Sequence, residues 1–345
     1  MLYYRVVAGN SNHVPAIRSE SQHMAITSPP YVDAKPYDRD NPENIGNYQI
    51  DEQLKMLKPV YKEVLRVLQP GRKFIMNVPD MVALSPIDGK SCHIPLFEKT
   101  ISLLEDIGFI YEMPFMWDKM HSRSANNNGS WPYPGGVVLV HDFEPIGIFR
   151  KPGQPDYSHV TKEQREASKM SSEFMADAMY NTIKIQGESQ IKYHIAAYPE
   201  ELVDRFIALY TFVGESVYDP FGGSGTTVVE AKKYERSGVM CEIGFKTPDG
   251  TPWIDNVTRR IGWNDGSLHG EQILYEILDS EGNIISSDVV EGRGKLDVNV
   301  LNELGEKALD RFGSFNPDSD IPIEKDKKPK KKKEPEEDKA QTRLF

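Results

Sequence analysis

The pattern of apolar and polar positions predicts strands that alternate with helices. Short apolar runs, rich in β-branched and aromatic residues, predict strands at 2–8, 24–27, 73–78, 109–117, 137–149, 216–218 and 237–242. Apolar residues at helical spacing predict helices at 54–68, 95–107 and 200–212, a helix that ends at 233, and a short helix at 14–18. This alternation indicates an α/β sandwich with a mainly parallel sheet.

Segments between these elements are polar or rich in proline and glycine. Residues 33–49 and 118–136 are predicted loops, and residues 160–190 have weak helical character. Residues 273–286 suggest a hairpin, and residues 296–312 a final helix.

Composition narrows the class of protein. The 345 residues are 39% apolar and 27% charged, which is typical of a globular chain. No apolar run reaches the ~18–20 residues of a membrane span, and the first residues have no signal pattern, so we expect an intracellular, cytoplasmic protein. Two cysteines, Cys92 and Cys241, form no disulfide framework and no zinc cluster. No histidines have metal-ligand spacing, so we expect no metal.

The net charge of −11 argues against a strongly cationic nucleic-acid coat protein. The excess of acidic residues is concentrated late in the chain. Residues 206–316 carry 10 Lys and Arg against 18 Asp and Glu, a net charge of −8. A polyanionic partner would therefore more readily meet the first two-thirds of the chain.

Segment 219–227 (DPFGGSGTT) is a glycine-rich turn between a predicted strand and a predicted helix. Glycines let backbone approach a ligand closely, and the start of a helix offers free N–H groups. A phosphate-binding P-loop is disfavoured because no lysine follows Gly225, and a dinucleotide fingerprint because position 228 is Val228. Asp219 and Glu242 each end a predicted strand, where acids grip a nucleoside. We favour a nucleoside-bearing ligand over a tight turn without one.

Residues Ser28, Pro29, Pro30 and Tyr31 form a second turn after a predicted strand. The prolines fix the backbone, so that the Pro29 carbonyl and Ser28 Oγ can both accept hydrogen bonds from an exocyclic amino group. Two such acceptors make the amino nitrogen more nucleophilic. Tyr31 offers a flat face for stacking a flipped base. The alternative is an ordinary Pro-Pro loop.

The two turns together resemble the motifs of DNA amino-methyltransferases, which methylate cytosine N4 or adenine N6. The Ser-Pro-Pro-Tyr motif precedes the glycine-rich one, which resembles the circularly permuted order of the β-class. Further segments resemble this family at residues 8–11 (AGNS), 63–78, 117–119, 141–144 and 194–202. The resemblance covers about residues 5–260. It implies a seven-stranded Rossmann-like methyltransferase sheet sandwiched by helices, with an inserted target-recognition region and S-adenosylmethionine as cofactor.

The resemblance also implies a role for each motif residue. Catalysis would rest on Ser28, Pro29, Pro30 and Tyr31, by direct in-line transfer without a cysteine intermediate. S-adenosylmethionine would be bound by Asn10 (where the family more often has Asp), Tyr198, Pro199, Asp219, Phe221, Gly223, Ser224, Thr226 and Glu242. The loop at 33–49 resembles the segment that closes over DNA, so Lys35 and Arg39 are candidate contacts to double-stranded DNA. Basic and aromatic residues also cluster around the insert, which makes Lys119, Arg123, Trp131 and Arg150 further candidates; the alternative is a solvated loop. The implied regions are a catalytic half (1–118), a target-recognition insert (119–190), a cofactor half (191–260), an extension of unknown role (261–312) and a disordered charged tail (313–345).

Several alternatives stay open at this point. Ser28 favours cytosine N4, because the adenine enzymes more often have Asp there; adenine N6 is the alternative. An RNA or protein-glutamine methyltransferase is less favoured, since those relatives place the cofactor motif first. A catalytically inactive DNA- or clamp-binding module is disfavoured because both motifs are intact. A role in restriction–modification fits the favoured interpretation, and a homodimer is compatible with it.

The last five residues, QTRLF, resemble the short Gln-x-x-Leu-Phe peptides that dock on DNA sliding clamps. Gln341 would hydrogen-bond beside an apolar pocket filled by Leu344 and Phe345. The charge run that precedes them is expected to be a solvated linker.

Overall fold

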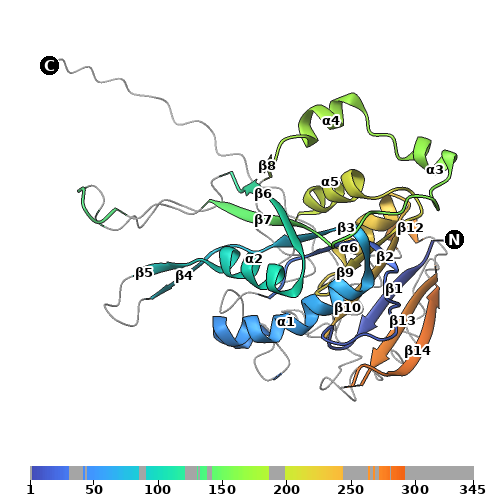
Figure 1. Ribbon diagram of the computed structural model, residues 1–345, viewed down its shortest axis with the longest axis horizontal. Helices are drawn as coiled ribbons and strands as arrows, with labels where there is room; N and C mark the ends of the chain where they lie inside the picture. Colours follow the sequence, from blue (N-terminus) through green and yellow to red (C-terminus); the bar gives the residue numbers. More distant parts are fainter. Residues whose placement is uncertain are drawn as a thin grey trace, which may run out of the picture. The chain divides into compact units, whose positions relative to one another are not determined.

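The computed structural model describes residues 2–30, 42, 45–84, 91–120, 130, 133–137, 142–185, 199–243, 263–264, 267–268, 272–279 and 281–291. Its main feature is a sheet of ten described strands in the order β14-β13-β1-β10-β9-β2-β3-β7-β6-β8 (Figure 1). Their bounds are β1 Tyr4–Ala8, β2 Gln22–Thr27, β3 Leu68–Asn77, β6 Ile110–Asp118, β7 Phe143–Arg150, β8 Thr182–Lys184, β9 Ser216–Asp219, β10 Ser237–Glu242, β13 Gln272–Leu278 and β14 Ile284–Glu291.

The described helices and the two small hairpins complete the list of elements. The helices are η1 Ile45–Asn47, α1 Ile50–Val67, α2 Leu96–Ile107, α3 Lys162–Ala167, α4 Ser172–Ala178, α5 Glu200–Tyr210 and α6 Thr226–Lys233. The hairpins pair β4 Met81–Leu84 with β5 Ser91–Ile94, and β11 Trp263–Asn264 with β12 Ser267–Leu268. None of the helices in the described part of the chain has the length and apolar character needed to span a membrane.

Seven adjacent strands form the expected Rossmann-like sheet. Strands β1, β10, β9, β2 and β3 run parallel, β7 is antiparallel to β3, and β6 is antiparallel to β7. The predicted α/β architecture is therefore confirmed. Three further strands widen the sheet: β8 pairs with β6 at one end, and the β13–β14 hairpin pairs through β13 with β1 at the other.

Alternate strand residues face two separate hydrophobic cores. In β3, Phe74 and Met76 belong to a core shared with α1 and α2, whereas Ile75 belongs to a core shared with α5 and α6. Successive side chains of a strand point to opposite faces of the sheet. Both faces of β3 are thus covered, which explains the near-continuous apolar run at 73–78.

Several local expectations are corrected. Residues 14–18 form turns rather than a short helix, because side chains bind their backbone: Glu63 Oε2 accepts from Val14 N at 3.1 Å, and Arg66 donates to Val14 O and to Ile17 O at 2.9 Å. Strand β3 begins at Leu68 rather than at residue 73, and it therefore includes Pro70 and Gly71, which lie outside the predicted strand.

Further along the chain, β7 begins at 143 rather than 137, and the weakly helical stretch 160–190 contains α3, α4 and β8. The hairpin expected at 273–286 is present as β13–β14. The expected helix at 296–312 and the charged tail lie outside the described residues.

Candidate active site

The carboxyl ends of the parallel strands meet at one edge of the sheet. Ala8 of β1 pairs with Glu242 of β10, and Met240 of β10 pairs with Asp219 of β9. Strand β2, which pairs with β9, ends at Thr27, immediately before the Ser-Pro-Pro turn (residues 28–30). The two turns singled out in the sequence therefore follow neighbouring strands at the same edge, the place where open α/β sheets bind ligands.

The glycine-rich turn (residues 219–227) has a backbone that requires glycine. Gly223 and Gly225 have φ angles of 50° and 84°, in the left-handed region. A Cβ atom on Gly222 would lie 2.6 Å from Met240 Cβ, so only glycine fits against β10 there. Gly222 N donates to Cys241 O at 2.9 Å, which holds the turn close to that strand.

Asp219 organises this turn from the end of β9. Its side chain is only 1% exposed. Oδ1 accepts hydrogen bonds from Thr27 Oγ1 at 2.6 Å and from Phe221 N at 3.0 Å, while Oδ2 accepts from Thr227 Oγ1 at 2.6 Å. Through these contacts Asp219 joins the end of β2, the glycine-rich turn and the start of α6. A direct contact of Asp219 with a cofactor stays a prediction.

Glu242 ends β10 and is also buried. Its Oε2 accepts from Gly223 N at 2.9 Å and its Oε1 from Ile243 N at 3.0 Å. Asn10 lies close by in the fold, because the preceding residue, Gly9, donates its N–H to Glu242 O at 2.8 Å. Asn10 Oδ1 accepts from Asn12 N at 3.0 Å and so closes a local turn.

Other residues predicted for the cofactor lie along the same turn and nearby. Phe221 packs against the hydrophobic core, and Ser224 Oγ lies 3.4 Å from Thr226 Oγ1. Pro199 is buried at the start of α5. Tyr198 lies outside the described residues. Asn10, Asp219 and Glu242 lie at or just after the carboxyl ends of β1, β9 and β10, which are neighbours in the sheet.

The Ser-Pro-Pro turn is held at both ends. Thr27, before it, binds Asp219, and the Pro30 carbonyl, at its end, accepts a hydrogen bond from Gln53 Nε2 of α1. Pro29 is buried, whereas Ser28 and Pro30 are half-buried. Thr27 and Gln53 were not identified from the sequence. The sequence signal for Thr27 was a hydroxyl residue at the end of an apolar strand, directly before the motif, but its partner Asp219 lies 192 residues away.

A small pocket opens next to this turn. Its lining residues are Ile26, Thr27, Ile75, Asn77, Ile146, Leu202 and Phe206. Asn77, the last residue of β3, donates through Nδ2 to Glu144 Oε2 at 3.1 Å, and Glu144 forms an ion pair with Lys119. The Lys119 ammonium lies 5.1 Å from the centre of the Trp117 ring. The predicted DNA contact Lys119 is thus at the active-site edge, together with Asn77 and Glu144, for which no role was predicted.

Arg150, another predicted DNA contact, lies at the opposite edge of the sheet. Strand β7 runs antiparallel to β3 and β6, so that Arg150 pairs with Lys73 in the middle of β3 and with Ile110 at the start of β6, whereas Ile146 pairs with Asn77 at the end of β3. Arg150 Nε donates to Glu112 Oε1 at 2.9 Å. The structure does not bring Arg150 to the catalytic turn, because the chain direction of β7 carries it away. The predicted site residues outside the described part of the chain are Tyr31, Lys35, Arg39, Arg123, Trp131, Tyr198, Gln341, Leu344 and Phe345.

Burial makes Cys241 chemically inert. Its thiol lies in the core beside Tyr218, and burial raises the pKa of Cys241 to about 12. A cysteine attacks as the thiolate, which is scarce at neutral pH when the pKa is this high. Cys241 is therefore poorly suited to act as a nucleophile.

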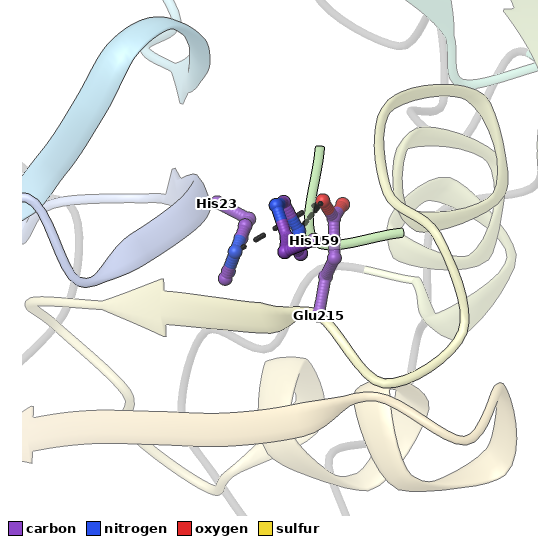
Figure 2. A group of neighbouring side chains, drawn as sticks. All are labelled: His23, His159 and Glu215. Carbon is purple, nitrogen blue, oxygen red and sulfur yellow. Dashed lines mark hydrogen bonds and ion pairs between the residues drawn. The ribbon is translucent and has the colours of Figure 1, made fainter. Parts of the chain in front are cut away.

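His23, His159 and Glu215 form a separate polar cluster, at the edge where β2 and β9 begin (Figure 2). Their ligand atoms lie within 4.8 Å of one another, a grouping that the sequence did not reveal. Buried Arg72 forms an ion pair with Glu215, and the positive charge of Arg72 would repel a metal cation. Ser216 N donates to His23 Nδ1 at 3.1 Å, so neutral His23 carries its proton on Nε2, the nitrogen a metal would need. The donor set therefore fits a hydrogen-bonded cluster better than a metal site.

Comparisons with known proteins agree on one family. A sequence model described as DNA methylase (N6_N4_Mtase) matches residues 22–247. The type II methyltransferase M.MjaI of Methanocaldococcus jannaschii is 31% identical over 267 residues, which cover 70% of this chain and 87% of that protein. M.MthZI of Methanothermobacter thermautotrophicus is 28% identical over 271 residues, covering 71% of this chain and 74% of that protein.

Solved structures give the same result. The crystal structure of a Thermus thermophilus protein described as a DNA modification methylase, in complex with S-adenosyl-L-methionine, superposes with a TM-score of 0.60 at 26% identity, covering 80% of this chain and 98% of that one. PvuII DNA methyltransferase (cytosine-N4-specific) superposes with a TM-score of 0.54 at 20% identity, covering 77% of this chain and 89% of that one. At that identity the second match supports the fold alone.

Proposed function

Because the chain belongs to the N6/N4 family of DNA methylases, we propose that it is a site-specific DNA methyltransferase that methylates the exocyclic amino group of a base flipped out of the duplex. We favour cytosine N4 over adenine N6 as the target, because Ser28 is the first residue of the catalytic motif. The observation that carries the proposal is the junction of the two turns: Thr27, just before Ser28, bonds Asp219 of the glycine-rich turn at 2.6 Å. In-line transfer requires methyl donor and acceptor to lie side by side. The pairing of β2 with β9, the strands that lead into these two motifs, supports such an arrangement.

The glycine-rich turn and its neighbours fit S-adenosylmethionine, which a structural relative binds. S-adenosylmethionine supplies an electrophilic methyl group when bound. Glu242 would accept hydrogen bonds from the ribose hydroxyls, and the narrow turn at Gly222 and Gly223 lets backbone approach the ligand. The remaining lining would come from Asn10, Tyr198, Pro199, Asp219, Phe221, Ser224 and Thr226.

The Ser-Pro-Pro-Tyr motif would activate the target amino group. In this proposal Ser28 Oγ and the Pro29 carbonyl each accept a hydrogen bond from one N–H of the amino group. These hydrogen bonds reduce delocalisation of the nitrogen lone pair into the ring. The Pro30 carbonyl is already bonded to Gln53, so its role is to hold the turn. Tyr31 would stack on the flipped base.

Two parts of this proposal concern DNA. We place target recognition in the insert at 119–190, with Lys119 at its start on the active-site edge and with Lys35, Arg39, Arg123 and Trp131 as further contacts; Arg150 is left out because it lies at the other edge. By analogy with the type II relatives, the chain would protect specific sequences in the cytoplasm of its host.

The direct test is transfer of labelled methyl from S-adenosylmethionine to duplex DNA and, in parallel, to RNA. We expect saturable transfer to duplex DNA and none to RNA. Ser28→Ala should lower the rate at least about 100-fold, because one of two acceptors on the amino group is lost. Transfer to RNA alone would contradict the proposal, and a Ser28→Ala protein with wild-type turnover would remove Ser28 from catalysis.

We also propose that Gln341, Leu344 and Phe345 dock on a DNA sliding clamp, which rests on the motif in the sequence. Titration of a labelled peptide of residues 336–345 onto purified clamp should give saturable binding. Binding should be lost in the Leu344→Ala/Phe345→Ala peptide, since the apolar pair would fill the pocket. Equal binding of both peptides would refute the idea.

A further inference from the structure

We propose that Thr27 is a positioning residue for the reaction: its hydrogen bond to Asp219 fixes the Ser-Pro-Pro turn relative to the methyl donor held by the glycine-rich turn. This inference rests on the proposed function. It assigns a role to a residue outside both motifs, and it gives Asp219 a second role beside the cofactor.

The bond is short and shielded from water. Thr27 is fully buried, and its Oγ1 lies 2.6 Å from Asp219 Oδ1. This O···O distance lies at the short end of the normal range for O–H···O hydrogen bonds. Loss of a donor from a buried carboxylate is costly, because water cannot easily replace it.

The backbone pairing between β2 and β9 stops short of this point. The register joins Met24 to Val217 and Ala25 to Tyr218, whereas the pairing of β2 with β3 continues to Thr27 and Met76. Beyond Ala25 and Tyr218, the hydrogen bond from the Thr27 side chain to Asp219 therefore links β2 to β9. It links the two strands at the point where each leads into its functional turn.

The Asp219 carboxylate also accepts hydrogen bonds from the turn that is proposed to bind the cofactor. Asp219 accepts bonds from Phe221 N, within the glycine-rich turn, and from Thr227 Oγ1, in the first turn of α6. A shift of this turn is therefore passed to Thr27 and directly to Ser28, the next residue. Since a misplacement of about 1 Å can cost about 100-fold in rate, this connection is expected to matter for turnover.

The test compares three threonine variants in the full chain. Thr27→Val keeps the β-branched shape but removes the hydroxyl, and Thr27→Ser restores the hydroxyl. Thr100→Val is the matched control: Thr100 is buried in α2, where its Oγ1 donates to Leu96 O at 2.8 Å, away from both turns. Single-turnover methyl transfer to duplex DNA, the dissociation constant of S-adenosylmethionine and the melting temperature are measured for each.

We expect Thr27→Val to lower the single-turnover rate about 10- to 100-fold, while the dissociation constant changes by no more than about twofold. Thr27→Ser should recover most of the rate, and Thr100→Val should match the wild type. A wild-type rate in Thr27→Val would overturn the inference. Equal losses in Thr27→Val and Thr27→Ser would also overturn it, since the hydroxyl would then not be the cause.

Amide hydrogen exchange separates failure of this inference from failure of the proposed function. If the wild-type chain methylates no nucleic acid, the function is wrong, but the connection can still be measured. A peptide covering residues 22–30 should exchange faster in Thr27→Val than in Thr100→Val or the wild type. Unchanged exchange in Thr27→Val would refute the connection whatever the activity.

Discussion

Asp219 shows why the position of a residue in the sequence gives only part of its role. Its place at a strand end, before a glycine-rich turn, correctly predicts a location at the carboxyl edge of the parallel strands. Its carboxylate also accepts a hydrogen bond from Thr27, which is 192 residues distant. Such a pairing depends on which strands become neighbours, which no local pattern reveals. Gln53 and Glu144 escaped prediction for the same reason.

Gly222 provides a residue-scale test of the glycine-rich turn. Gly222→Ala should weaken S-adenosylmethionine binding at least about tenfold, because the new Cβ would lie 2.6 Å from Met240 Cβ and force the turn to move. Equilibrium dialysis measures the dissociation constant. Gly147→Ala is the matched control: its Cβ would contact the Phe149 ring in β7, so it should reduce stability with little effect on binding. Equal binding losses in both variants would contradict this account of the turn.

His23 gives a second residue-scale prediction, for the pH dependence of stability. Burial, outweighing the opposing pull of Glu215, lowers the pKa of His23 from 6.5 to about 4. As the pH falls from about 6.5 to 4, the unfolded chain takes up a proton that the folded chain does not, so the free energy of unfolding decreases, by up to about 3 kcal/mol.

The variant His23→Asn tests this, because its Oδ1 can still accept from Ser216 N while nothing at the position titrates. Denaturant unfolding at pH 7.5, 6, 5 and 4.5 should show a smaller loss of stability in the variant than in the wild type. Parallel pH curves for the two proteins would show that His23 is not the group responsible.

Among elements, the strands and helices of the central sheet were largely predictable, because buried parallel strands and amphipathic helices have distinct apolar patterns. The predictions that were wrong concern short segments. Residues 14–18 have a helix-like pattern, yet side chains of Glu63 and Arg66 take up their backbone groups. Strand β3 runs through Pro70 and Gly71, where Lys151 O accepts a hydrogen bond from Gly71 N at 3.0 Å.

The β13–β14 hairpin was foreseen as a hairpin but not as an edge of the main sheet. Leu278 of β13 is fully buried against the same core as Val7 and Cys241. Leu278→Ala should therefore lower the free energy of unfolding by about 2–4 kcal/mol through the cavity it leaves. Ile284→Ala in β14, where the side chain is 43% exposed, should cost about 0.5 kcal/mol or less. Urea titration compares them, and equal effects would mean that the hairpin does not help to form the core.

At the scale of the whole molecule, the net charge of −11 is compatible with a DNA substrate because of where the acid lies. Residues 206–316 hold −8 of it, whereas residues 1–205, which contain the catalytic turn and the insert, hold only −4. Phosphate contacts supply only part of DNA recognition, and an enzyme that must leave its site needs no strongly cationic body. The proposal therefore depends on the active site rather than on overall charge.

The measurement that tests the central claim most directly is mass spectrometry of nucleosides from duplex DNA incubated with the chain and S-adenosylmethionine. The account predicts a methylated exocyclic amino group, specifically N4-methylcytosine, and its loss with Ser28→Ala. N6-methyladenine alone would keep the enzyme class but reverse the proposed base. No methylated base with the wild-type chain, although S-adenosylmethionine binds, would contradict the central claim.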